Sequence, residues 1–169
     1  MVFRSQTSAK QYKGTMDISH GMRHCLVVDA LDASKNGSED KDQLLSVVVD
    51  DDESVRESLP DLLREFGFAA RAFSSANEFL SSGCVDETSC LILDVAMPGM
   101  SGPELQQELK RRGKDIPIVF ITGRRDDAIR DQVLQQGAAG FLLKPFSEID
   151  LLAAIKAALQ GTSGSTLDL

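Results

Sequence analysis

Polar residues that can handle a phosphoryl group stand at the ends of four short apolar runs in this chain. An acid pair, Asp50 and Asp51, follows the first run, while Asp94, Thr122 and Lys144 end the other three. Short apolar runs bounded by turn residues are typical of strands buried on both faces, and in open parallel sheets the functional groups gather at the carboxyl ends of such strands. We therefore expect these residues, distant in the sequence, to form one site.

Three of these side chains are carboxylates, and their number predicts a bound cation. Two like charges about 4 Å apart repel by about 4 kcal/mol at an effective dielectric constant of roughly 20. A divalent cation removes that cost, and Mg²⁺ takes oxygen ligands and is commonly held by one or two carboxylates together with phosphate oxygens. We expect Mg²⁺ as the cofactor, with Mn²⁺ as a possible substitute.

Asp94 is the residue that we expect to accept the phosphoryl group, because a carboxylate at the end of a central buried strand is costly unless it has a partner or a task. The alternative is that Asp94 caps the turn or helix that follows Pro98 and Gly99. Lys144 would supply positive charge and Thr122 a hydroxyl donor, since phosphoryl transfer needs positioning and charge neutralisation. These roles are inferred from the positions of Lys144 and Thr122 at strand ends, because a single Lys or Thr is more often an ordinary surface residue.

The acidic run continues to Asp52 and Glu53, which we interpret as the amino-terminal charge of the first helix. From Leu44 onward, strand and helix patterns alternate five times. Five βα units with short loops predict an α/β fold with a doubly wound, five-stranded parallel sheet. The expected strands are 45–50, 68–73, 89–94, 118–122 and 140–143, and the expected helices are 54–66, 75–82, 102–112, 126–136 and 147–160.

Composition narrows the class of protein. The chain is 42% hydrophobic and carries a net charge of −8, which fits an acidic globule without a basic face for nucleic acid. No run approaches the roughly 20 apolar residues of a membrane span, and the first residues lack a signal-peptide core, so we expect a cytoplasmic protein. We expect a flexible arm over 1–43, one domain over 44–161 and a flexible tail over 162–169.

Four sequence blocks, in this order and with these gaps, resemble the receiver domain of bacterial two-component response regulators. The resemblance covers about residues 44–161, and the helices are closest in style to those of FixJ/NarL-type transcriptional regulators. The blocks are Val-Val-Val-Asp-Asp-Asp-Glu-Ser-Val-Arg (47–56), Leu-Asp-Val-Ala-Met-Pro-Gly-Met-Ser-Gly (93–102), Ile-Thr-Gly (121–123) and Gly-Phe-Leu-Leu-Lys-Pro-Phe (140–146).

This resemblance implies a flavodoxin-like (β/α)5 fold with strand order 2-1-3-4-5. It implies that Asp94 takes a phosphoryl group from a phosphohistidine of a sensor histidine kinase, so that the protein is a phosphoacceptor with self-catalysed phosphotransfer and dephosphorylation rather than a classical enzyme. It further implies that Asp51 and Asp94 bind the metal directly with the main-chain carbonyl of Ala96, and that Asp50 acts mainly through water. A cis peptide before Pro145 would point Lys144 inward.

The resemblance also implies a switch made by Thr122 and Phe141. They would reshape the face formed by the fourth helix, fifth strand and fifth helix, with a phosphorylation-dependent homodimer as the readout. Control of transcription would then need an output domain, and the residues after Gln160 are too few for a helix-turn-helix.

Three other interpretations stay open on the sequence. A phosphatase of the haloacid-dehalogenase type would use Asp50 as its nucleophile, with Asp52 completing an Asp-x-Asp motif, although Ser54 stands where that class expects Thr or Val. A pure interaction module would no longer accept phosphate. A free-standing receiver or phosphate sink would have no output domain of its own.

Overall fold

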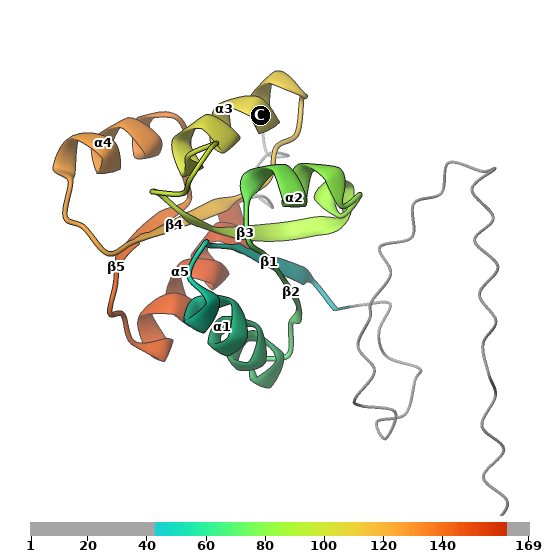
Figure 1. Ribbon diagram of the computed structural model, residues 1–169. Coiled ribbons are helices and arrows are strands. Elements are labelled where there is room, and N and C mark those ends of the chain that lie inside the picture. Colours follow the sequence, from blue (N-terminus) through green and yellow to red (C-terminus); the bar gives the residue numbers. More distant parts are fainter. Residues whose placement is uncertain (1–42, 162–169) are drawn as a thin grey trace, which may run out of the picture.

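The computed structural model describes residues 43–161, which form a parallel five-stranded sheet with helices on both faces (Figure 1). The strands lie in the order β2-β1-β3-β4-β5, and every neighbouring pair is parallel. The predicted doubly wound, flavodoxin-like fold and its strand order are therefore confirmed. The order reverses between β1 and β3, which is where ligands bind in open α/β sheets.

The element boundaries agree with the predicted ones to within one residue at each end. The strands are β1 (Leu45–Val49), β2 (Ala69–Phe73), β3 (Thr88–Asp94), β4 (Ile118–Thr122) and β5 (Gly140–Leu143). The helices are α1 (Glu53–Glu65), α2 (Ala76–Ser81), α3 (Gly102–Arg111), α4 (Asp127–Gln135) and α5 (Glu148–Gly161), and a short 3₁₀ helix, η1 (Val85–Glu87), precedes β3.

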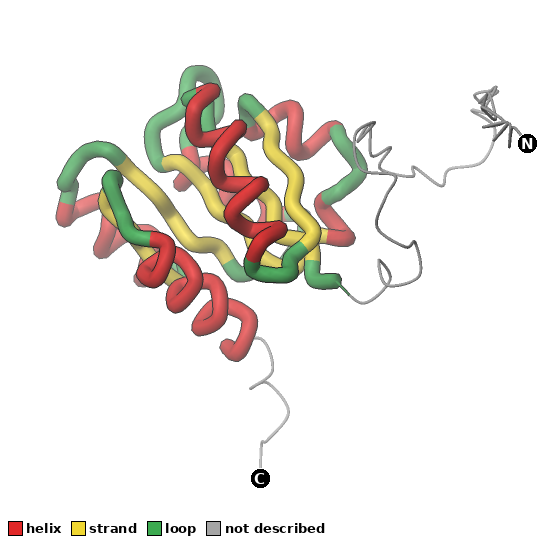
Figure 2. The backbone as a smooth tube through the Cα atoms, turned by 90° about the horizontal axis from the view of Figure 1, so that it is seen from below, coloured by secondary structure: helices red, strands yellow, loops and turns green. Residues whose placement is uncertain are grey.

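The sheet is covered by α1 and α5 on one face and by α2, α3 and α4 on the other (Figure 1). Seen from below, the strands form one twisted layer with α1 and α5 on the near side (Figure 2). Alternate residues of each strand serve the two faces: Val47 and Val49 pack in the cluster under α2, α3 and α4, whereas Val48 packs with Leu63 of α1 and Ile155 of α5. This two-sided burial explains why the central strands β1, β3 and β4 consist mostly of consecutive apolar residues.

Helix starts are fixed by side chains that the sequence presents at the right places. Ser101 and Glu104 form a reciprocal capping box at the start of α3, and Asp52 accepts a hydrogen bond from the backbone of Ser54 at the start of α1. Gly137 follows the carboxyl end of α4 and has a φ of 94°, a conformation that favours glycine. The interpretation of Asp52 and Glu53 as amino-terminal charge of the first helix is confirmed.

The predicted arm over 1–43 lies outside the described residues except for its last position, and so does the predicted tail over 162–169. Within the described part of the chain, no helix is both long enough and apolar enough to cross a membrane.

Candidate functional site

Strand register brings the expected site residues to one edge of the sheet. Val49, the last residue of β1, is level with Leu93, so Asp50 follows β1 where Asp94 ends β3. Asp94 is in turn level with Ile121, the residue before Thr122. The sheet order thus collects at its carboxyl edge the polar groups that lie far apart in the chain.

The carboxylates of Asp50, Asp51 and Asp94, here called the acidic cluster, each offer an oxygen within 4.8 Å of the others. Asp50 is fully buried, Asp94 is 6% exposed and Asp51 is exposed. Burial, followed by the negative charge of Asp50, raises the pKa of Asp94 to about 6 although Lys144 acts in the opposite direction. The acidic cluster therefore holds unfavourable negative charge that a cation would relieve.

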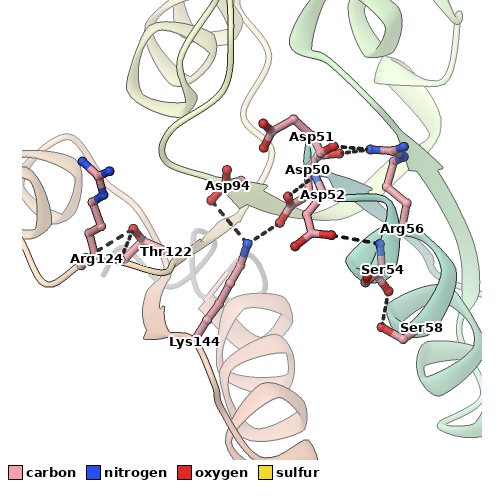
Figure 3. Close-up of polar contacts among 10 residues, drawn as sticks. All are labelled: Asp50, Asp51, Asp52, Ser54, Arg56, Ser58, Asp94, Thr122, Arg124 and Lys144. Atoms are coloured by element: carbon pink, nitrogen blue, oxygen red, sulfur yellow. Dashed lines mark hydrogen bonds and ion pairs between the residues drawn. The ribbon is translucent and has the colours of Figure 1, made fainter.

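Lys144 reaches this cluster from β5. Its Nζ lies 2.6 Å from Asp50 Oδ2 and 3.6 Å from Asp94 Oδ1 (Figure 3). Partial burial of Lys144 would lower its pKa, but the hydrogen bond to Asp50 and the charges of Asp94 and Asp50 outweigh that effect and raise the pKa. The expected cis peptide precedes Pro145, and the Lys144 side chain points into the site as expected.

Both oxygens of Asp50 already have partners. Oδ1 accepts a hydrogen bond from the backbone N–H of Asp52 at 2.9 Å, and Oδ2 accepts one from Lys144 at 2.6 Å. Because Asp50 is also fully buried, its carboxylate is badly placed to attack a substrate. Asp94 forms a more distant ion pair with Lys144 and also interacts with the side chain of Asp51, and it does not cap α3, since Ser101 performs that role.

Thr122 is buried beside the site, but its hydroxyl is turned towards its own loop. Thr122 Oγ1 accepts a hydrogen bond from the Arg124 backbone N–H at 3.2 Å and lies 3.3 Å from the Arg124 carbonyl oxygen (Figure 3). Phe141 is half-buried on β5 and lines a hollow of about 330 Å³ with residues of α4 and its preceding loop. The other lining residues are Arg125, Asp126, Asp127, Arg130 and Leu143.

Two residues near the acidic cluster had no assigned role in the sequence. Gly102 begins α3 so close to the end of β3 that a Cβ there would lie 2.3 Å from the Asp94 carbonyl oxygen. Arg56 donates from Nη1 to the carbonyl oxygens of Asp50 and Asp51. Both stand in the sequence blocks 47–56 and 93–102, but neither contact could be inferred from residue types alone.

The donor set fits a hard divalent cation. Its members are carboxylate oxygens, the ligand type that Mg²⁺ prefers, and Asp51 is open to solvent while Asp50 and Asp94 are buried. Ala96, whose carbonyl was expected to join them, lies two residues beyond β3 and is exposed.

Comparison with known proteins agrees with this geometry. The response regulator TodT of Pseudomonas putida is 45% identical over 113 residues, which cover 67% of this chain and 50% of TodT. The transcriptional regulatory protein FixJ of Azorhizobium caulinodans is 42% identical over 112 residues, which cover 66% of this chain and 53% of FixJ. The chain thus spans about half the length of these curated relatives.

Among solved structures, the response regulator StyR superimposes with a TM-score of 0.67 at 45% identity, covering 72% of this chain and 61% of StyR. The response regulator receiver domain family matches residues 47–156, a span that contains every residue of the acidic cluster as well as Thr122, Phe141 and Lys144. On this match, the chain belongs to the response regulator receiver domain family of two-component signalling.

Proposed function

We propose that this domain accepts a phosphoryl group on Asp94 from the phosphohistidine of a sensor histidine kinase. Receiver domains are signalling domains rather than classical enzymes, and sensor histidine kinases are the partners of the family. The proposal rests on the arrangement of the acidic cluster. Carboxylate oxygens of Asp50, Asp51 and Asp94 lie within 4.8 Å of one another, and Lys144 Nζ lies 3.6 Å from Asp94 Oδ1.

Asp94 is the best-placed nucleophile of the three carboxylates. Asp50 is fully buried with both oxygens hydrogen-bonded, and Asp51 is exposed at the rim. In the reaction, an Asp94 oxygen forms a bond to phosphorus while the bond from phosphorus to the histidine nitrogen breaks. The positive charge of Lys144 balances the negative charge on the phosphoryl oxygens.

Asp51 and Asp94, together with the main-chain carbonyl of Ala96, would hold Mg²⁺, and Asp50 would contribute through water. The ion would neutralise the negative charge of the carboxylates and of the incoming phosphoryl oxygens. Asp52 is excluded from this set because its carboxylate caps α1. Asp51→Ala is therefore expected to weaken metal binding strongly, whereas Asp52→Ala is expected to weaken it little.

Thr122 and Phe141 would transmit the modification. A phosphoryl group on Asp94 presents new acceptor oxygens, so the Thr122 hydroxyl would leave Arg124 and turn towards them. Phe141 would then move into the space behind Thr122. Burying a fully exposed Phe side chain is favourable by about 1.5–3 kcal/mol, and because Phe141 is already half-buried, roughly half of that gain is available, enough to shift a two-state equilibrium severalfold.

The face formed by α4, β5 and α5 is where we place the output, with a homodimer as its readout. The relatives TodT and FixJ are regulators of about twice the matched length, and FixJ is named as a transcriptional regulator. By analogy, we propose that this domain controls transcription through an output domain. Residues 44–161 would form the receiver unit, and the segment before Gln43 would be dispensable for folding and for labelling.

The test is labelling by a small phosphodonor, acetyl phosphate, with and without Mg²⁺. Wild type should be labelled only with Mg²⁺ or Mn²⁺, and Asp94→Asn should not be labelled. Asp50→Asn is the informative comparison: label that survives in Asp94→Asn and disappears in Asp50→Asn would favour the dehalogenase-type phosphatase. A wild type that binds metal but never takes label would instead be a pure interaction module.

A further inference from the structure

We propose that Arg56 is a positioning residue that fixes the acidic loop, residues 50–52, in the shape required for metal binding. The inference rests on the proposed function in that it takes the acidic cluster as the cation site. It assigns a role to a side chain that lies outside the set of carboxylates, Thr122 and Lys144.

The acidic loop is short and strongly charged. β1 ends at Val49 and α1 begins at Glu53, so only three consecutive aspartates join them. Two of these, Asp50 and Asp51, carry cluster carboxylates, and the third caps α1. Consecutive acidic residues repel one another, so specific contacts are needed to hold the acidic loop in a single tight conformation.

Arg56 provides contacts of the required kind. From α1 its side chain returns to the loop, and Nη1 donates to the Asp50 carbonyl at 3.0 Å and to the Asp51 carbonyl at 2.7 Å. In the described part of the chain, these carbonyls are the partners of its side chain rather than any carboxylate. Arg56 is half-buried, and its charge-assisted hydrogen bond to the Asp50 carbonyl is partly buried, whereas the one to the Asp51 carbonyl is exposed.

The direction of these hydrogen bonds decides where the carboxylates point. Two successive carbonyls converge on one nitrogen, and Figure 3 shows the Asp51 carboxylate directed away from Arg56, on the side of Asp94. Lys144 approaches Asp50 from a different direction in the same view. Arg56 therefore holds the acidic loop through its main-chain carbonyls, and Lys144 holds it through the side chain of Asp50.

Positioning and simple charge predict opposite effects on the metal, which makes the inference testable. If Arg56 acted only through its charge, it would repel Mg²⁺, and its removal would tighten metal binding. If it positions the loop, its removal weakens metal binding, as does loss of other groups that orient metal ligands. Arg56→Lys keeps the charge but ends one bond short of Nη1 and lacks the planar donor fork.

The experiment measures Mn²⁺ affinity of the full chain by electron paramagnetic resonance for wild type, Arg56→Met and Arg56→Lys. Hydrogen exchange of the Asp50 and Asp52 amides, which donate to the Phe73 carbonyl and to Asp50 Oδ1, is followed in the same samples without metal. We expect Mn²⁺ affinity to fall by about 10-fold in Arg56→Met and by a smaller factor in Arg56→Lys. The two loop amides should exchange faster in both variants.

Arg64 offers a matched control at the far end of α1. It also donates to a backbone carbonyl, that of Ala70, and it pairs with Asp61. Arg64→Met should affect thermal stability without changing Mn²⁺ affinity or loop exchange. If Arg56→Met does not fold, Arg56→Lys carries the same test.

Unchanged affinity in both Arg56 variants, or tighter binding in Arg56→Met with an unchanged Arg56→Lys, would overturn the positioning role. Wild type that binds no Mn²⁺ would instead refute the proposed cation site itself, so the two failures are distinguishable.

Discussion

At the carboxyl edge of the sheet, the ammonium group of Lys144 donates a hydrogen bond to the buried carboxylate of Asp50, with 2.6 Å between Nζ and Oδ2. The fully buried carboxylate of Asp50 thus has a cation as its partner in the unphosphorylated state. The same ammonium lies 3.6 Å from the phosphoacceptor candidate, Asp94. A short movement of one side chain therefore separates a structural ion pair from contact with a phosphoryl group.

Lys144→Met should lower the free energy of unfolding measured without metal by about 1–3 kcal/mol, because it leaves the Asp50 carboxylate buried with one hydrogen bond. Mg²⁺ affinity should rise, since no ammonium competes for the carboxylates, while labelling by acetyl phosphate should slow. Urea unfolding and metal titration measure the two effects. Lys114→Met is the control: Lys114 pairs with the exposed Asp86, so its loss should change stability by less than about 1 kcal/mol. Equal losses in the two variants would contradict the structural role of Lys144.

The raised pKa of Asp94 makes stability depend on pH in a defined direction. Its folded pKa of about 6 lies above the ordinary value of 3.8, so the native state holds a proton that the unfolded chain releases. The resulting stabilisation is complete below about pH 4 and is lost as the pH rises through about 6. Without metal, Asp94→Asn should therefore match wild type near pH 4 and exceed it at pH 7 by about 1–2 kcal/mol, after allowance for solvent screening.

Urea unfolding in EDTA across this pH range measures the difference, and saturating Mg²⁺ should reverse its sign at pH 7 because only wild type retains the full cluster. A constant difference between pH 4 and pH 7 would show that Asp94 titrates normally.

Gly102→Ala should damage both the fold and the site. The new Cβ would stand 2.3 Å from the Asp94 carbonyl oxygen and 3.0 Å from the Phe120 ring, so α3 or the end of β3 must shift. We expect the free energy of unfolding to fall by about 2–4 kcal/mol, with slower labelling of the protein that remains folded. Gly123→Ala is the control, because a Cβ there meets nothing within 4 Å. Similar behaviour of the two variants would show that α3 does not constrain Asp94.

Beryllofluoride, which mimics the phosphoryl group, should convert the protein from monomer to dimer. The hollow beside Phe141 offers room for rearrangement between β5 and α4, and Thr122 must give up its contacts with Arg124 to start it. Sedimentation velocity should show the dimer in wild type but not in Thr122→Ala or Phe141→Ala. A wild type that stays monomeric would refute the dimer, and variants that dimerise normally would refute the relay.

Most of the fold could be predicted from the sequence because its three central strands, β1, β3 and β4, are buried on both faces. Short apolar runs such as Val47–Val49 indicate strands rather than buried helix segments because they are short and rich in β-branched residues, and the polar residue that ends such a run marks the edge of the sheet. The order of the strands came from the resemblance rather than from periodicity, because a period of two says nothing about neighbours.

The site was predictable in its membership but not in its contacts. Asp94, Asp51 and Lys144 could be named because each stands at a strand end. That Lys144 contacts Asp50 more closely than Asp94 depends on side-chain conformation. The contacts of Arg56 and Gly102 depend on how helices meet the sheet, which no local pattern encodes.

Identification of the modified residue tests the central claim most directly. The full chain is incubated with acetyl phosphate and Mg²⁺. Borohydride then reduces the aspartyl phosphate to homoserine with release of inorganic phosphate, and mass spectrometry of the peptides locates the homoserine. The account predicts modification at Asp94 alone, and none when EDTA replaces Mg²⁺. Modification at Asp50 or Asp51 in the wild-type chain, with Asp94 unmodified, would contradict it.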